Sequence, residues 1–214
     1  MPHKFNDDGQ SIQISFPNNA NLQLPDPDLL MYYRDTQERI FWISGEIDAD
    51  TLSLIQHIVH INRDDKDVPI KDRRPIKLVF FSPGGDLEAE KALSPIIEFS
   101  KTPIYGIAIG MCASAASMLF LSCHKRYCTK SATFIFHQGG CENVQGSYQQ
   151  VNAFMANYQK DIMEMAEFYK SHTRFPPDVI DAKLAAGDWY ISSSEALENG
   201  VVDKVINSLD VFLK

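Results

Sequence analysis

Short apolar runs alternate with amphipathic segments through most of the chain, and this alternation predicts its secondary structure. The runs Arg39–Ser44 and Ile76–Phe81 are rich in β-branched and aromatic residues, and each gives way to a stretch that contains glycine. Between them, apolar residues recur at helical spacing over Ala49–Ile61. Strands that alternate with helices are typical of βαβ crossovers, so we predict an α/β fold.

The rest of the chain repeats this alternation, and its longest predicted helix covers Gly146–Ser171. Apolar residues in that helix advance by three or four positions and form one continuous stripe, which needs a partner surface on a domain this small. The further strands are predicted at Ile104–Ile109, Arg126–Thr129, Thr133–Phe136 and Val201–Ile206, and the further helices at Leu87–Ser100, Ala113–Ser122, Asp178–Ala185 and Ser194–Asn199.

The N-terminal residues differ from the rest because they are polar and punctuated by proline. We predict an extended N-terminal arm over residues 1–28, with strand character at Ser11–Phe16. A single domain over residues 29–214 follows, since a chain of 214 residues has room for one domain with a sizeable core. Residues 1–19 lack the apolar core of a signal peptide, and none is expected.

One uncharged stretch, Thr102–Cys123, is long enough to span a bilayer. Glycines and serines interrupt its apolar character along its length. We therefore predict a strand that enters a buried helix, and no membrane segment.

The composition is that of a globular protein with an excess of acidic residues. A hydrophobic content of 44% excludes wholesale disorder, and a formal charge of −8 argues against a general nucleic-acid binder. The four cysteines form no CxxC pair, and Cys123-His124 with Cys128 lacks a second pair of ligands. We expect no metal, and reduced thiols in a cytoplasmic protein.

Ser114 is the first residue with a plausible chemical role. A buried strand runs into Gly110, and small residues surround this serine before the next predicted helix begins. At a helix N-terminus, free backbone N–H groups and the positive end of the helix dipole stabilise a developing oxyanion. The alternative is that Ser114 is an ordinary helix N-cap.

The pair Gly84-Gly85 follows the buried strand Ile76–Phe81 directly. Glycines at the carboxyl end of a strand allow backbone N–H groups to face a cleft without obstruction by side chains. In open α/β sheets, ligands bind at that end of the strands. A simple turn is the alternative interpretation.

His137 follows the apolar strand Thr133–Phe136 and precedes Gly139-Gly140. That position presents an imidazole to a cleft, although a core histidine whose ring bonds to a carbonyl group has the same surroundings in sequence. A serine and a histidine need a third group that fixes the imidazole tautomer. The residue pattern alone does not choose among the 28 carboxylates.

Together these motifs resemble the Clp protease proteolytic subunit and the ClpP-like serine peptidases. The resemblance runs from about Glu38 to Ile206, and the order and spacing of the motifs make it specific. The motifs are Glu38–Phe41 with Gly45 after it, Ser82–Gly85, Gly110–Ser114, Phe136–Gln138, Asp188–Ser192 and Glu195–Asp203.

The resemblance implies a catalytic triad in which Ser114 is the nucleophile, His137 the general base and Asp188 the carboxylate that orients the imidazole. It also implies an oxyanion hole formed by the backbone N–H groups of Gly85 and Ala115. The implied mechanism is acylation of the serine by a peptide carbonyl, followed by hydrolysis of the acyl-enzyme by water activated at the histidine.

The implied fold is crotonase-like: repeated βαβ units with a protruding handle, here the helix predicted at Gly146–Ser171. Subunits of the family form a heptameric ring, and two rings stack through their handles to enclose the active sites. An AAA+ ATPase feeds the chamber with unfolded polypeptide. The resemblance therefore implies a homo-oligomeric serine endopeptidase. The chain contains no phosphate-binding loop, in keeping with a subunit that needs no cofactor.

Several positions depart from the family pattern. Asp86 stands where an apolar residue is usual, which puts a carboxylate at the substrate cleft. The loop at residues 64–74 is longer than expected, and residues 1–28 do not match the family's axial-loop segment, which bears on ATPase docking. The other departures are Met111, Ala115, Ala116 and Gly139.

Other functions stay open at this point. Gly-Gly-Asp together with Ala-Ser-Ala-Ala-Ser looks like the divergent, phage-associated branch, whose peptidases process capsid precursors. A catalytically dormant partner subunit would share the fold, and so would an acyl-CoA enzyme of the crotonase superfamily. The last needs glycine-rich oxyanion segments but no triad, so the presence of Ser114, His137 and Asp188 favours the peptidase.

Overall fold

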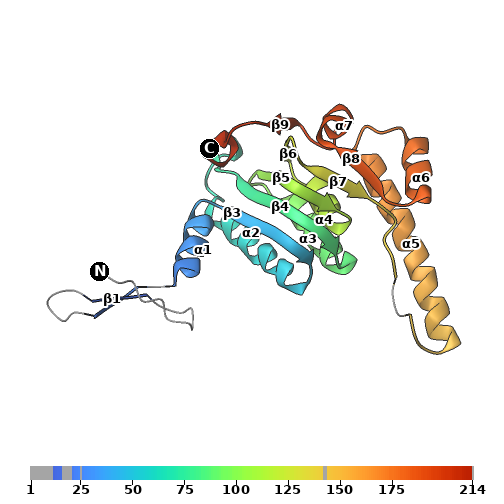
Figure 1. The fold of residues 1–214 in the computed structure, drawn as a ribbon, viewed down its shortest axis with the longest axis horizontal. Coiled ribbons are helices and arrows are strands. Elements are labelled where there is room, and N and C mark those ends of the chain that lie inside the picture. The colour runs from blue at the N-terminus through green and yellow to red at the C-terminus, as the bar shows by residue number, and fades with distance from the viewer. Residues whose placement is uncertain (1–11, 16–20, 25, 142–143, 214) are drawn as a thin grey trace. The chain divides into compact units, whose positions relative to one another are not determined.

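The computed structural model describes residues 12–15, 21–24, 26–141 and 144–213 (Figure 1). The chain divides between Phe41 and Trp42 into two compact units. In the first, strands β1 (Ile12–Ser15) and β2 (Asn21–Leu24) pair antiparallel, and helix α1 (Pro27–Gln37) follows. Strand β1 matches the strand character predicted in the arm, most of which lies outside the described residues.

The second unit is built on a seven-stranded sheet. Its path runs β3-β4-β5-β6-β9, and β7 pairs with β5 and then with β8. The pairs from β4 to β9 along the path are parallel, and so is β5 with β7, whereas β7 and β8 are antiparallel. The strands are β3 (Ile40–Ile47), β4 (Ile76–Gly85), β5 (Ile104–Ala113), β6 (Lys125–Thr129), β7 (Thr133–Phe136), β8 (Trp189–Ser192) and β9 (Lys204–Ile206).

Helices connect the strands, as the α/β prediction requires. The longest, α5, extends from the sheet as a single rod (Figure 1) and is the helix predicted at Gly146–Ser171. The α-helices are α2 (Ser53–Asp64), α3 (Leu87–Phe99), α4 (Ala115–Leu121), α5 (Tyr148–His172), α6 (Pro177–Ala186), α7 (Ser193–Glu198) and α8 (Asp210–Leu213), with short 3-10 turns η1 (Ala49–Leu52) and η2 (Ile70–Asp72).

Strands β4 and β5 continue past the residues at which the sequence pattern placed their ends. We predicted ends at Phe81 and Ile109, but β4 reaches Gly85 and β5 reaches Ala113, with a bulge between Phe80 and Ser82. Glycine does not break β5 because the ring of Phe81 occupies the space of a missing side chain: a Cβ on Gly110 would lie 2.6 Å from that ring. The longer strands carry the serine and glycine motifs to one edge of the sheet.

Two aromatic pairs pack in the core. Phe120 of α4 packs edge-on against Phe80, with ring centroids 5.4 Å apart. Phe136 stacks on Tyr169 of α5 at 4.1 Å, and both residues are fully buried. Burial of such large side chains is worth about 2–3 kcal/mol each and fixes the carboxyl-terminal half of α5 against β7.

Within the described ranges, no helix has the length and apolar character that crossing a bilayer requires. The uncharged stretch Thr102–Cys123 folds as β5 followed by α4, and its residues in α4 are all buried.

Candidate active site

Strand register brings three residues to one edge of the sheet. In the parallel pair β5–β7, Ala113 lies opposite Ile135, so Ser114 and His137 follow neighbouring strand ends. In the antiparallel pair β7–β8, Phe136 lies opposite Trp189, which places His137 beside Asp188.

Ser114 has an unusual backbone conformation, with φ 53° and ψ −129°. For a residue with a side chain such a conformation costs on the order of 1–3 kcal/mol and needs support from its surroundings. Its N–H donates to Ile135 O at 2.9 Å, and its carbonyl accepts from Ser117 Oγ at 2.6 Å. The Ser114 hydroxyl makes no capping bond to α4, so the ordinary N-cap interpretation does not describe it.

Gly84 provides space for this conformation. A Cβ at Gly84 would lie 2.5 Å from the Cβ of Ser114 and 2.8 Å from Ala113 O, and its φ of 99° disfavours any side chain. Gly85 abuts β3, where a Cβ would lie 2.3 Å from Ile47 O. Because β4 continues through both glycines, the simple-turn interpretation of this segment is wrong.

His137 and Asp188 approach each other. His137 Nδ1 lies 3.5 Å from Asp188 Oδ1, and the Asp188 side chain is more than half exposed. The other ring nitrogen, His137 Nε2, is buried and has no hydrogen-bond partner among the described residues, Ser114 included. In a histidine with a purely structural role, both ring nitrogens would form hydrogen bonds. Nε2 of His137 therefore remains available for a hydrogen bond with a molecule in the site.

A cavity of about 490 Å³ connects these groups. Ser114, His137, Gly85 and Ala115 all contribute to its lining, and the loop Gln138–Cys141 forms another part. The predicted nucleophile, base and oxyanion-hole residues therefore face one space. Asp188 is not among the lining residues and stands behind the imidazole.

Helix α5 supplies a wall of the cavity that the sequence pattern did not assign to the site. Phe154 and Tyr158 stack with ring centroids 6.2 Å apart, and Tyr158 Oη donates to Gly139 O at 3.1 Å. Burial raises the pKa of the Tyr158 hydroxyl, and Cys141 adds to the effect. The periodicity of the helix marked these rings as part of an apolar stripe, but it did not indicate which end of the stripe meets the site.

Asp161, also on α5, anchors this wall to α3. The Asp161 carboxylate is buried and forms an ion pair with Lys91, and its second oxygen accepts from Asn157 Nδ2 at 3.1 Å. This pairing raises the pKa of Lys91, although burial alone would lower it. No local sequence signal points to the pair, because its members lie 70 positions apart.

A second buried carboxyl, Glu90, lies on α3 away from the cavity. It is 2% exposed, and its Oε1 has no hydrogen-bond partner among the described residues. Burial raises the pKa of Glu90 to about 7, against smaller opposite effects of Ser94 and Lys91. Oε1 of the neighbouring Glu98 lies 3.2 Å from His172 Nε2 on α5. Glu90 is thus a buried acid with one unpartnered oxygen, next to residues of α5.

The cysteine and histidine residues considered as metal ligands have other contacts. Cys123 Sγ donates to Leu119 O at 3.5 Å, and His124 Nδ1 accepts the N–H of Ile104 at 3.0 Å. In the described part of the chain, no group of three or more His, Cys, Asp or Glu side chains is arranged to hold a metal ion.

Comparison with known proteins identifies the family of this chain. The model of the Clp protease family matches residues 29–209, most of the chain. The chain belongs to the Clp protease family. Among curated proteins, it is similar to ATP-dependent Clp protease proteolytic subunit 2 of Treponema pallidum (strain Nichols). The two are 25% identical over 179 residues, which cover 83% of this chain and 86% of the relative.

Membership of the Clp protease family agrees with the crotonase-like expectation of a mixed α/β fold with a parallel sheet, and it supports a peptidase activity. The family match begins at residue 29, inside helix α1, and ends at residue 209, just before α8. All of the candidate site residues fall inside the matched range.

Proposed function

We propose that this chain is a serine endopeptidase in which Ser114 is the nucleophile, His137 the general base and Asp188 the group that orients the imidazole. The observation that carries the proposal is that Ser114 and His137 line one cavity together with Gly85 and Ala115, while Asp188 Oδ1 lies 3.5 Å from His137 Nδ1. Apo structures often have long or absent catalytic hydrogen bonds, which tighten when substrate binds.

Acylation begins when Ser114 Oγ attacks the carbonyl carbon of a peptide bond. His137 Nε2 takes the hydroxyl proton and then delivers it to the leaving amine nitrogen as the C–N bond breaks. A water molecule attacks the acyl-enzyme, and its proton returns through Nε2 to Ser114 Oγ as the ester bond breaks. Asp188, at 3.5 Å from Nδ1, favours the tautomer that leaves Nε2 free to accept.

The negative oxygen of each tetrahedral intermediate needs hydrogen-bond donors. We assign this role to the backbone N–H groups of Gly85 and Ala115, which belong to residues lining the same cavity. Ala115 is the first residue of α4, and the first N–H groups of a helix have no partner within it. Removal of one such donor typically costs 10²–10³ in rate.

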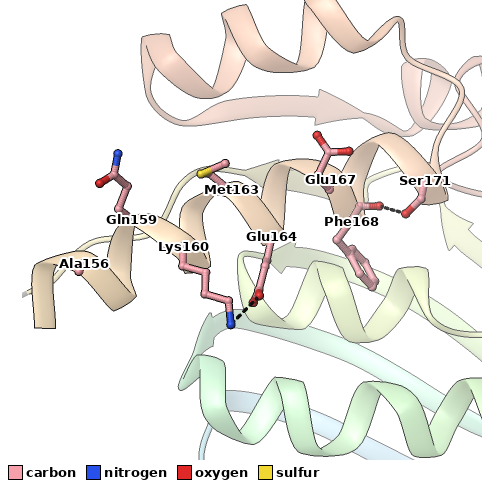
Figure 2. Close-up of a pocket in the computed structure, with 8 residues that line it drawn as sticks. All are labelled: Ala156, Gln159, Lys160, Met163, Glu164, Glu167, Phe168 and Ser171. Atoms are coloured by element: carbon pink, nitrogen blue, oxygen red, sulfur yellow. Dashed lines mark hydrogen bonds and ion pairs between the residues drawn. The ribbon is translucent and has the colours of Figure 1, made fainter. Parts of the chain in front are cut away.

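The proposal includes assembly into a homo-oligomeric ring, with α5 as the contact between two stacked heptamers. The relative from T. pallidum is named as a subunit of an ATP-dependent protease, and an AAA+ partner that supplies unfolded polypeptide would suit this chain too. Figure 2 shows side chains that line a pocket along α5, among them Met163 and Phe168 as well as charged residues, and this surface supports the assembly. Met163 is 63% exposed, as an interface residue is before its partner binds.

A cytoplasmic location fits the four free cysteines.

The test is intact-mass spectrometry of the purified chain after treatment with a fluorophosphonate. We expect one adduct on the unmodified chain and none on Ser114→Ala. Asp188→Asn should reduce the labelling rate by orders of magnitude, because the wrong tautomer blocks Nε2. Labelling that persisted in Ser114→Ala would disprove the assignment of the nucleophile.

A dormant subunit is the second candidate, and the missing bond between His137 Nε2 and Ser114 favours it. Such a chain would give no adduct by itself. Adduct formation after mixing with a catalytically active family member, or after addition of an ATPase partner, would identify a subunit that is switched on by assembly.

A further inference from the structure

The candidate active-site cavity is lined by acidic side chains that have no role in the proposed mechanism. Three carboxylates contribute to its lining, those of Asp86, Glu88 and Asp161, and none of its described lining residues is a lysine or an arginine. Asp86 and Glu88 therefore make the cavity negative where α3 begins, and Asp161 adds a carboxylate from α5.

Asp86 is held in a fixed position next to the proposed oxyanion hole. Its N–H donates to Ile47 O at 2.8 Å, and its Oδ1 accepts the N–H groups of Glu88 and Ala89 at 2.7 and 3.2 Å. Both N–H groups bond to Oδ1. Because Oδ1 accepts both bonds, the second oxygen, Oδ2, remains available to a donor in the cavity.

A single lysine, Lys91, lies near three of the carboxylates at or beside the cavity. Lys91 pairs with the buried Asp161, lies 3.4 Å from Glu164, and approaches Glu88 only at 3.9 Å. Asp161 is therefore neutralised, whereas Glu88 is 78% exposed and only loosely paired. The positive end of the α3 dipole offsets roughly half a unit charge, which is less than the charge of Asp86 and Glu88 together.

Apart from the paired Asp161, the lining residues that α5 contributes are aromatic or apolar in body. Phe154 and Tyr158 stack on each other, and Met165 is buried. A cavity of about 490 Å³ that is lined by both apolar and acidic side chains is complementary to a side chain that has a long methylene stem and a cationic end. Lysine and arginine are the amino acids of that kind.

We infer that the cleft selects lysine or arginine at the substrate residue whose carbonyl is attacked, with Asp86 and Glu88 as the specificity-determining residues. This inference rests on the proposed function for its catalytic meaning. The binding preference itself concerns the cavity and holds even in a subunit that does not hydrolyse peptides.

The experiment measures binding and hydrolysis separately. Three dye-labelled tripeptides that differ only in a terminal arginine, leucine or glutamate are titrated against the full-length Ser114→Ala chain, with fluorescence anisotropy as the readout. We expect the arginine peptide to bind about threefold to tenfold more tightly than the leucine peptide, as one or two partly exposed ion pairs allow. The difference should shrink as salt rises from 50 to 500 mM.

Two variants connect the preference to these residues. Asp86→Asn keeps the helix cap, because asparagine caps as well as aspartate, and Glu88→Gln keeps the shape of the side chain. The double variant should bind the arginine peptide and the leucine peptide with equal affinity. Asp178→Asn is the matched control: it removes a carboxylate from the first turn of α6, outside the cavity lining, and the ratio should stay unchanged.

Equal binding of the three peptides, no measurable binding of any, or a preference that survives the double variant would each overturn the inference. Failure of the proposed function has a different signature. In that case the chain with Ser114 intact gives no fluorophosphonate adduct, while the arginine preference in anisotropy persists. With both correct, hydrolysis of coumarin amides of the same peptides follows the order of binding.

Discussion

Ser114 combines a costly backbone conformation with a hydroxyl that no local bond restrains. Hydrogen bonds at both ends of the residue support this conformation: its N–H donates to Ile135 O, and its carbonyl accepts from Ser117 Oγ. Gly84 then leaves room for the Ser114 side chain on the strand next to it. The orientation of the hydroxyl thus depends on neighbours rather than on the serine alone.

This dependence predicts a large effect of a single methyl group. Gly84→Ala should reduce the rate of fluorophosphonate labelling at Ser114 by at least about tenfold, because the new Cβ would lie 2.5 Å from the Ser114 Cβ. Gly45→Ala is the control for the backbone cost alone: its φ of 92° is close to the 99° of Gly84, but nothing lies within 4 Å. Labelling rates and urea unfolding of both variants are the measurements. Equal effects would show that the contact with Ser114 does not matter.

Glu90 provides a second test at this scale, on stability. Its folded-state pKa of about 7 lies above the ordinary carboxyl value of 4.5. The folded state therefore binds the proton more tightly than the unfolded state, and this contribution is present at low pH and lost as pH rises from 4.5 through 7. The full difference is on the order of 3 kcal/mol.

Glu90→Gln should remove this loss, because an amide is neutral at every pH. We expect the unfolding free energy of the variant, relative to the unmodified chain, to rise by about 2–3 kcal/mol between pH 5 and pH 8. Glu88→Gln, an exposed neighbour on the same helix, should leave the pH dependence as it was. A parallel pH dependence for the unmodified chain and Glu90→Gln would show that Glu90 titrates alike in both states.

At the scale of elements, the α/β alternation and the long helix were predictable from periodicity, which local spacing determines. The ends of β4 and β5 were not, because pairing and the Phe81 ring over Gly110 override the tendency of glycine to end a strand. Strand β8 was not predicted either: it has four residues, and its antiparallel pairing with β7 defines it. That pairing also fixes Asp188 beside His137.

Part of the candidate site could likewise be predicted from the sequence, and part could not. Ser114, His137 and the glycine motif follow predicted strands, so their neighbourhood could be expected from the sequence, and the family resemblance added Asp188. The α5 wall and the Lys91–Asp161 pair could not be expected, because they arise from packing between α3 and α5 across 70 positions. Long-range ion pairs leave no periodic signal in a single sequence.

For the whole molecule, the exposed apolar side chains of α5 predict that the chain does not stay monomeric. Met163→Glu should shift the assembly towards smaller species in native mass spectrometry, because a charge at this position would be desolvated in a helix contact. Leu209→Glu, at a residue that is 70% exposed and distant in sequence, is the control and should leave the assembly unchanged. An unaltered mass distribution of Met163→Glu would remove this face of α5 from the interface.

The thiols of this chain differ in access in a way that has a practical consequence. Cys112, Cys123 and Cys128 are buried, and burial raises the pKa of each thiol, whereas Cys141 is exposed at the edge of the cavity. A maleimide dye should therefore attach at one place without any engineered cysteine. Such a fluorophore would sit at the cavity proposed to bind the substrate, and its emission would report occupancy in real time, even in a chain that never turns over.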